Sequence, residues 1–401
     1  MVQWKKVKIQ DIGTVVGGAT PSTKIDANYK NGHISWITPK DLSTFEGRYI
    51  YTGERNITEM GLNSSSTVLM PKNSILFSSR APIGYVAIAG KELCTNQGFK
   101  SVIPNKKIDY LFLYYLLKYN KNKIENLGSG TTFKEISGSV MKNVEVMIPE
   151  DINEQKRIAA VLNSIDDKIE LNNEINDNLL SQLKASFKHD YLENNDNKAW
   201  KNVEFGSIVS KFATGLNPRK NFVLGHGKNY YVTIKNMGDN RIYLDDKCDK
   251  VDDEALIKIN ARSDLKQGDF LFSGIGTIGR VYYIDKTPEN WNISESVFTI
   301  RPNNTVSSEF MYLLLLSDKL QNYVQQHAQG SAQKGIRMAD FKKCKLLLPN
   351  IEKMEELSDM WRPLINQSKL LDDENNRLAS IRDSLLPKLM SGEIDVDSIE
   401  L

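Results

Sequence analysis

The chain has 401 residues, of which 40% are apolar and 25% charged, and its formal net charge is +2 at pH 7. This length allows two or three domains, the composition is ordinary for a globular protein, and the apolar runs are too short to span a bilayer. Residues 1–10 lack an apolar signal region, the three cysteines are scattered, and the four histidines lack metal-ligand spacing, so we expect a cytoplasmic protein without disulfides or a metal.

The first 150 residues carry the signals of a mixed α and β domain. Short runs rich in β-branched and aromatic residues predict strands at residues 34–38, 74–78 and 85–88. Apolar residues at three-to-four spacing predict a helix over residues 108–123. A Gly/Ser-rich loop follows at residues 128–134, and a short strand ends at Pro149.

The same order of signals returns about 200 residues later. Trp4-Lys5-Lys6-Val7 recurs as Trp200-Lys201-Asn202-Val203, and Val146–Pro149 recurs as Leu346–Pro349. The second copy predicts strands at 230–234, 269–273 and 280–284, a helix at 308–326 and a Gly/Ser loop at 330–334. Each copy is large enough to be a domain, so we predict two α+β domains in tandem, at residues 1–150 and 193–349.

Each domain is followed by a long helical pattern, at residues 151–192 and 350–401. The first stripe consists of Ile158, Leu162, Ile165, Ile169, Ile175, Leu179, Leu183 and Phe187. The second consists of Leu357, Leu364, Leu371, Leu378 and Leu385 at period seven, with Trp361 and Ile381 between them. Period seven indicates a coiled coil, in which polar Asn172 and Gln367 would set the register. We expect two helices of about 57 Å that pair antiparallel; the alternative is that each packs on its own domain.

Charge is divided unevenly between these segments. The net charge is +7 for residues 1–150 and +4 for residues 193–349, but −3 for residues 151–192 and −6 for residues 350–401. A basic domain beside an acidic helix suits the binding of a polyanion, because neutralising phosphates supplies much of the affinity for nucleic acid.

Residues 272–279, Phe-Ser-Gly-Ile-Gly-Thr-Ile-Gly, match a glycine-rich nucleotide loop. Such a loop needs a helix next, whereas Val281–Ile284 has the pattern of a strand, and the first copy lacks two of the three glycines. We therefore interpret both copies as strand–turn–strand hairpins. No other motif for catalysis stands out, so the chain is expected to be non-catalytic.

The positions where the two copies differ are the better candidates for binding. Polar and basic side chains can read base edges or hold phosphates. The DNA-binding candidates in the first copy are Lys24, Arg48, Arg55, Ser79, Arg80, Asn96, Gln97, Thr131, Thr132, Phe133 and Lys134. Those in the second copy are Arg219, Lys220, Lys235, Asn236, Arg241, Thr277, Arg280, Asn292, Ser294, Ser331, Gln333 and Lys334.

Two stretches are distinctive: Ile148-Pro149 followed by Glu154-Gln155-Lys156-Arg157-Ile158-Ala159, and the ending Ser384-Leu385-Leu386-Pro387-Lys388-Leu389. With the order domain, helix, domain, helix, they make the chain resemble the specificity subunit of type I restriction-modification systems. The resemblance implies that each domain is a target recognition domain for half of a bipartite double-stranded DNA target. The helices would set the spacing and dock two methyltransferase subunits.

The same resemblance implies that cofactors belong to partner subunits. S-adenosylmethionine would serve adenine methylation, and restriction subunits would use ATP and magnesium. Two alternatives remain open: a duplicated S-adenosylmethionine-dependent DNA methyltransferase that uses the 272–279 glycines, and a coiled-coil adaptor without direct DNA contact.

Overall fold

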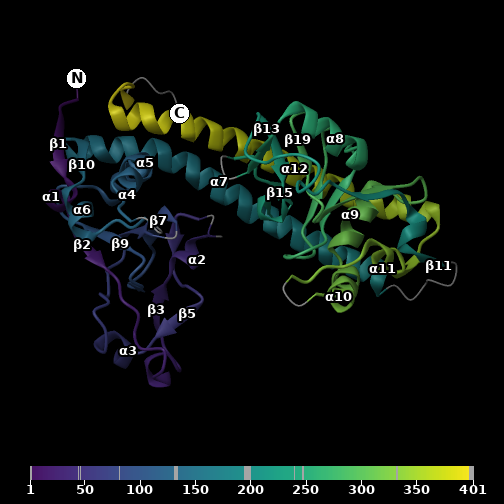
Figure 1. Cartoon of the computed structure of the whole chain (residues 1–401), viewed down its shortest axis with the longest axis horizontal. Coiled ribbons are helices and arrows are strands. Elements are labelled where there is room, and N and C mark those ends of the chain that lie inside the picture. The colour runs from purple at the N-terminus through teal and green to yellow at the C-terminus, as the bar shows by residue number, and fades with distance from the viewer. Residues whose placement is uncertain are drawn as a thin grey trace. The chain divides into compact units, whose positions relative to one another are not determined.

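The structure is a computed structural model that describes residues 2–43, 45, 47–80, 82–130, 134–193, 200–238, 240–245, 248–330 and 333–396. The chain forms two compact units: Met1–Glu174 with Asp372–Leu401, and Ile175–Leu371. Each unit holds one globular lobe and a part of both long helices, α7 (Ile152–Phe187) and α12 (Ile351–Ser391). Figure 1 shows the elements of both units and labels them where there is room.

The lobe of the first unit, lobe 1, is closed by its first and last strands. β1 (Trp4–Lys8) pairs antiparallel with β10 (Glu145–Pro149). The main sheet has the order β2 (Gly13–Gly17), β9 (Lys100–Pro104), β6 (Ile75–Ser79), β7 (Ile83–Ala89), β4 (Tyr49–Ile50). A second sheet has the order β5 (Arg55–Ile57), β3 (Ile34–Ile37), β8 (Cys94–Thr95). The helices are α1 (Ile9–Ile12), α2 (Pro39–Ser43), α3 (Glu59–Asn63), α4 (Tyr110–Tyr119), α5 (Lys121–Asn126) and α6 (Gly138–Asn143), with a 3-10 turn at Asp26–Asn28.

The lobe of the second unit, lobe 2, repeats this plan. β11 (Lys201–Glu204) pairs antiparallel with β21 (Lys345–Leu348). The main sheet has the order β12 (Val209–Thr214), β20 (Val297–Pro302), β17 (Phe270–Ser273), β18 (Val281–Tyr283), and the second sheet has the order β16 (Asp249–Val251), β13 (Asn229–Val232), β19 (Trp291–Ile293). The remaining elements are β14 (Met237–Gly238), β15 (Arg241–Ile242), α8 (Asp253–Ser263), α9 (Ser308–Leu316), α10 (Asp318–His327), α11 (Met338–Lys342), and 3-10 turns at Phe205–Ile208 and Ile234–Asn236.

The strand pairing confirms the tandem repeat. In lobe 1 the central strand β3 pairs antiparallel with β5 and parallel with β8. In lobe 2 the central strand β13 pairs antiparallel with β16 and parallel with β19. The two copies therefore share topology as well as sequence order, and the predicted α+β fold is confirmed.

The two predicted mid-domain helices are each broken once. Residues 108–123 form α4 and α5, which meet at Asn120, whose Nδ2 donates to the Leu116 carbonyl at 2.9 Å. In lobe 2 the break falls at Ser317, whose Oγ donates to the Leu314 carbonyl at 2.7 Å. Asn and Ser side chains that bond to nearby carbonyls compete with the helix, which explains why apolar spacing alone predicted one helix.

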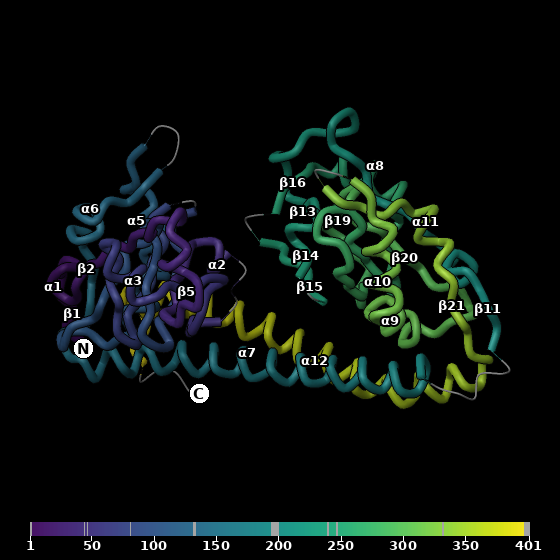
Figure 2. The backbone as a smooth tube through the Cα atoms, turned by 90° about the horizontal axis from the view of Figure 1, so that it is seen from below, coloured from purple at the N-terminus to yellow at the C-terminus, as the bar shows by residue number. Residues whose placement is uncertain are grey.

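Within each unit, α7 and α12 run antiparallel. In the first unit Asn172 Nδ2 donates to Asn375 Oδ1 at 2.9 Å, and Arg382 Nη1 lies 2.8 Å from Asp166 Oδ1. In the second unit Trp361 Nε1 donates to Ser186 Oγ at 2.9 Å. Figure 2 shows the start of α7 beside the end of α12 in the first unit. A short π-helical turn, Lys188–Leu192, follows α7.

The seam between the helices follows the predicted stripes in most positions. Ile158, Leu162, Ile165, Leu183, Leu357, Trp361 and Leu371 are buried, and Ile169, Leu179, Leu364, Leu378 and Leu385 are half-buried. Ile175 and Ile381 are 36% and 42% exposed, and Gln367 is exposed, so their placement in the seam was wrong. Gln367 and Ile381 fall off the stripe of α12 because its buried positions, such as Met354, Ser358, Trp361 and Ile365, alternate steps of three and four.

The long helices also complete the lobe cores. Ile158 and Leu162 join the core of lobe 1 beside Phe77 and Phe112. Phe187 and Trp361 join the core of lobe 2, with ring centroids 5.4 Å apart. Within each unit the two helices therefore contact each other and also pack on the lobe, so the alternative of two independent helices is wrong. None of the described helices is long and apolar enough to cross a membrane.

Candidate nucleic-acid interface

Three loops of lobe 1 converge through backbone hydrogen bonds. The Ser79 N–H, at the β6–β7 turn, donates to the Gly98 carbonyl at 2.7 Å. The Ser79 carbonyl accepts from the Ile136 N–H at 3.0 Å. The β6–β7 turn thus lies between the loop that follows β8 and the Gly/Ser-rich loop. Each loop carries one predicted DNA contact near these bonds: Arg80, Gln97 and Lys134.

An acidic residue organises the cations of this cluster. The Glu135 carboxylate lies 3.6 Å from both Arg80 Nη1 and Lys100 Nζ. The Lys100 side chain is 15% exposed, whereas that of Arg80 is 37% exposed. Glu135 therefore partly neutralises the cluster and orients Arg80, which remains accessible to a ligand.

Lobe 2 builds the same junction with different side chains. The Gly274 N–H donates to the Ser296 carbonyl at 2.9 Å, and the Gly274 carbonyl accepts from the Ile336 N–H at 3.0 Å. The Gly276 N–H donates to the Lys334 carbonyl at 2.7 Å. Thr277 and Lys334 are exposed here. The repeated scaffold thus presents two chemically different loop clusters.

The glycines of residues 274–279 have structural roles in this junction. A Cβ on Gly274 would lie 2.3 Å from the Phe298 ring, and Gly276 has a φ of +83°. β18 follows the turn and pairs with β17, placing Phe272 opposite Val281. A nucleotide loop requires a helix at this point, so the hairpin interpretation is confirmed.

Most of the remaining predicted DNA contacts lie at the surface. The exposed ones are Lys24, Arg55, Gln97, Lys134, Arg219, Lys220, Lys235, Thr277, Gln333 and Lys334. The half-buried ones are Arg80, Asn96, Arg241 and Arg280. Thr131, Thr132, Phe133 and Ser331 lie outside the described residues. Arg55 stacks on the Tyr29 ring with 4.1 Å between its guanidinium carbon and the ring centroid.

Five predicted contacts are buried inside the lobes, and a DNA contact by their side chains does not fit this burial. They are Arg48, Ser79, Asn236, Asn292 and Ser294, each less than 10% exposed. The Asn236 Oδ1 caps the 3-10 turn by accepting from Thr233 N–H at 3.0 Å, and Asn292 Oδ1 accepts from Ser263 Oγ at 2.7 Å. Ser294 Oγ and Ser296 Oγ lie 2.6 Å apart. The residue type alone does not show whether a polar side chain forms hydrogen bonds inside a lobe or contacts a ligand at the surface.

Arg48 anchors lobe 1 to α7. Its Nε and Nη2 bind the two carboxylate oxygens of Glu170 at 2.9 and 2.8 Å, its Nη1 donates to Asn163 Oδ1 at 2.5 Å, and its Nη2 also binds Asp167. Burial disfavours the Arg48 charge, but the hydrogen bonds to Glu170 and Asp167 outweigh burial and raise the pKa of Arg48. Lobe 2 uses another anchor, in which Lys369 Nζ of α12 lies 3.8 Å from the centroid of the Tyr283 ring.

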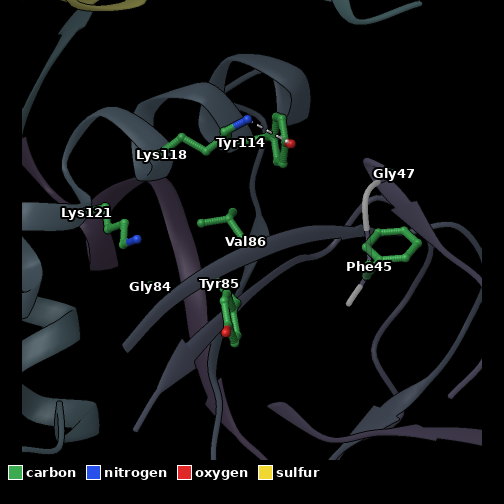
Figure 3. A pocket seen from close by; sticks show the side chains of 8 residues that line it. All are labelled: Phe45, Gly47, Gly84, Tyr85, Val86, Tyr114, Lys118 and Lys121. Carbon is green, nitrogen blue, oxygen red and sulfur yellow. Dashed lines mark hydrogen bonds between the residues drawn. The ribbon is translucent and has the colours of Figure 1, made fainter. Parts of the chain in front are cut away.

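Lobe 1 also contains a cavity of about 250 Å³ between β7 and α4. Figure 3 shows its lining residues: Phe45, Gly47, Gly84, Tyr85, Val86, Tyr114, Lys118 and Lys121. Lys118 Nζ donates to the Tyr114 hydroxyl at 3.4 Å, and burial lowers the pKa of Lys118. None of the predicted DNA contacts lines this cavity. Among the described residues, no group of three or more His, Cys, Asp or Glu residues could hold a metal ion.

Sequence reasoning missed several residues of the loop junctions. Lys100 and Glu135 belong to the lobe 1 cluster, and Glu295 occupies the corresponding loop of lobe 2. Thr20 and Asn217, which bind Gln97 and Glu295, each precede a proline. The Thr20-Pro21 pair of the first copy and the Asn217-Pro218 pair of the second could have pointed to these residues. The two pairs are recognised as equivalent only when the two lobes are aligned by structure.

The sequence model of the family described as "Type I restriction modification DNA specificity domain" matches residues 1–181 and 197–380. The chain belongs to this family and contains its domain twice. The chain is 32% identical over 420 residues to the type I restriction enzyme MjaIX specificity subunit of Methanocaldococcus jannaschii, covering 99% of this chain and 94% of that protein.

Two further similarities agree with this assignment. The chain is 31% identical over 172 residues, 41% of each protein, to the EcoR124I/EcoR124II specificity subunit of Escherichia coli. The crystal structure of a type I restriction-modification S subunit from M. genitalium shares the fold, with a TM-score of 0.52, 20% identity, and 97% of this chain and 96% of that one covered.

Proposed function

We propose that this chain is the DNA-binding specificity subunit of a type I restriction-modification complex. Lobe 1 reads one half of a bipartite target, and lobe 2 reads the other half. The observation that carries this proposal is the construction of one three-loop junction twice, with different exposed side chains in each copy, in a chain whose two halves both match the specificity domain family.

The charge distribution supports DNA as the ligand of both lobes. Residues 1–150 carry a net charge of +7 and residues 193–349 a net charge of +4. Exposed cations near the junctions, such as Lys134 and Lys334, are suited to phosphate contacts that fix the position of a lobe on the duplex. Neighbouring polar side chains then supply base discrimination.

The partners in this proposal are two methyltransferase subunits and, for cleavage, restriction subunits. The acidic helical segments dock the methyltransferase subunits and set the spacing between half-sites. Methylation requires the target base to leave the duplex stack. That step, together with S-adenosylmethionine, ATP and magnesium, belongs to the partner subunits, and the chain itself positions the duplex.

The test is to map adenine methylation by long-read sequencing in a host that expresses this chain with its methyltransferase subunits. The expected result is a single asymmetric motif made of two short half-sites with a fixed gap. Exchanging Thr131–Lys134 for Ser331–Lys334 is expected to alter one half-site only, because the loops belong to separate lobes.

Two results would contradict the proposal. One is a change in both half-sites after the single loop exchange. The other is the absence of salt-dependent DNA binding by the assembled complex, which would favour an adaptor that does not touch DNA. Tight S-adenosylmethionine binding by the isolated chain would instead place the chemistry in this subunit.

A further inference from the structure

Gln97 and Glu295 occupy the same position in the two lobes. In lobe 1 the Asn96 N–H donates to the Ile37 carbonyl at 2.9 Å, and the Gly98 carbonyl accepts from the Ser79 N–H at 2.7 Å. Gln97 lies between these two anchor points.

The corresponding anchors of lobe 2 have nearly the same lengths. The Ser294 N–H donates to the Val232 carbonyl at 2.8 Å, and the Ser296 carbonyl accepts from the Gly274 N–H at 2.9 Å. Glu295 lies between them. The two side chains therefore start from equivalent backbone positions. Gln97 lies directly beside the β6–β7 turn of lobe 1, and Glu295 lies beside the corresponding turn of lobe 2.

Each of the two side chains is held by a residue that precedes a proline. Thr20 Oγ1 donates to Gln97 Oε1 at 2.5 Å, and Asn217 Nδ2 donates to Glu295 Oε1 at 2.7 Å. The carbonyl of the residue before Thr20 or Asn217 accepts a hydrogen bond from an aromatic residue of the central strand. Trp36 Nε1 donates to the Ala19 carbonyl at 3.0 Å, and Tyr231 Oη donates to the Leu216 carbonyl at 2.7 Å.

The Glu295 carboxylate has a second partner, since it lies 3.1 Å from the Tyr231 hydroxyl. Burial and the charge of Glu295 raise the pKa of Tyr231, which keeps this hydroxyl protonated, and its single hydrogen is shared between the Leu216 carbonyl and Glu295. Glu295 thus presents a fixed acceptor. A carboxylate in a loop that faces DNA is repelled by phosphates and is suited to a donor on a base edge.

We propose that Gln97 and Glu295 are the equivalent base-reading residues of the two lobes. Gln97 selects adenine through its N6 and N7, and Glu295 selects cytosine through its N4 amino group, which is the pairing that their donors and acceptors allow. Thr20 and Asn217 position them. This inference rests on the proposed function, since it names the bases read at the same loop junctions.

The test uses the full chain assembled with its methyltransferase subunits and duplexes that carry its mapped target. Each base of each half-site is replaced in turn, and relative affinities are measured by competition. Gln97→Glu is expected to shift preference from adenine to cytosine at one position of the lobe 1 half-site, by roughly 10- to 100-fold. Glu295→Gln is expected to do the reverse in the lobe 2 half-site.

Gln10→Glu and Glu254→Gln are the matched controls, because both residues are exposed and lie on helices and not in the junction loops. They should leave every base preference unchanged. Thr20→Val removes the hydroxyl that holds Gln97 and provides a second measurement, with a weaker preference expected at the same base that Gln97→Glu changes.

The inference is overturned if both exchanges leave all preferences unchanged, if affinity falls equally for every duplex, or if Thr20→Val acts at a different base. A failure of the proposed function itself would give a different result. In that case the wild-type complex would show no bipartite target from which to begin.

Discussion

At the residue scale, burial decides what a polar side chain does in this protein. Arg48 has the chemistry of a phosphate contact, yet it is 4% exposed and binds three residues of α7. Gln97 is equally polar but exposed, and it stands between two backbone anchors of the loop junction. Arg48 and Gln97 differ because the fold places carboxylates of α7 beside Arg48. The residue type does not predict which groups the fold brings near a side chain.

Arg48→Ala should lower the free energy of unfolding by about 2 kcal/mol, because it leaves Glu170 and Asn163 without their cationic partner. The loss is moderated since Asp167 and Glu170 keep some access to water. Urea unfolding of the full chain measures it. Lys40→Ala, which breaks an exposed pair with Glu54, is the control and should change stability far less than Arg48→Ala does. Equal effects of the two variants would contradict the anchoring role.

Lys118 allows a prediction about pH. Burial lowers its pKa below the value in the unfolded chain, so the unfolded chain binds more protons in the window between the two values. This residue therefore destabilises the fold below its lowered pKa, and its cost decreases as the pH rises toward 10.5. Lys118→Met should stabilise the chain at pH 7 and give a smaller gain at pH 10. A gain that grows with pH would show that Lys118 has a charged partner in the fold.

At the scale of elements, the antiparallel helix pair combines an apolar seam with a buried polar layer. Asn172 is fully buried and Asn375 is 5% exposed, and Asn375 Nδ2 also donates to Asn173 Oδ1 at 2.8 Å. Among the described residues, the Asn172 Oδ1 has no hydrogen-bond partner. Such a layer weakens a helix pair but penalises every register in which the amides would face leucines.

A double substitution tests this layer. Asn375→Leu alone should lower stability by about 1–3 kcal/mol, because it strands buried amide groups of Asn172. Adding Asn172→Leu should recover most of the loss or exceed the wild-type stability, since apolar pairs suit this seam. Chemical unfolding is the measurement, and Asn376→Leu, at an exposed position of α12, is the control. If the stability changes of the two single substitutions simply added in the double variant, the two asparagines would not act as a pair.

The elements also show how far the sequence can predict the fold. Local patterns predicted the strands and long helices because alternation and three-to-four spacing are local properties. They missed the breaks at Asn120 and Ser317, which depend on single side-chain hydrogen bonds. Leucines at period seven predicted the seam of α12 but misplaced Ile381, which is 42% exposed and lies off the three-and-four spacing of the buried positions.

At the scale of the whole molecule, the candidate sites were only partly predictable. The repeat showed where the two copies differ and so identified Arg80 and the loop that contains Lys134, whereas Gln97 was a candidate by its residue type alone. The repeat could not identify Glu295, whose equivalence to Gln97 is apparent only when the pairing of β13 with β19 is matched to the pairing of β3 with β8. Long-range strand pairing creates the site, and single-sequence patterns carry little information about such pairing.

The helices yield a prediction about spacing. Four residues inserted near Asn173, with four in the matching turn of α12, would lengthen the pair by about 6 Å. The mapped target should keep both half-sites and gain about two base pairs in its gap, given roughly 3.4 Å per base pair along the duplex. Methylation mapping measures the gap. An unchanged gap would contradict the role of the helices in spacing, whereas altered half-sites would indicate damage to the lobes.

The closure of each lobe by its own first and last strands has a genetic consequence. Because β1 pairs with β10, and β11 with β21, the chain enters and leaves each lobe through neighbouring strands. A DNA segment that encodes one lobe from end to end can therefore be exchanged by recombination without cutting a sheet. We expect such exchanges to produce a new target preference in a single step, which makes each lobe a unit of variation within a population.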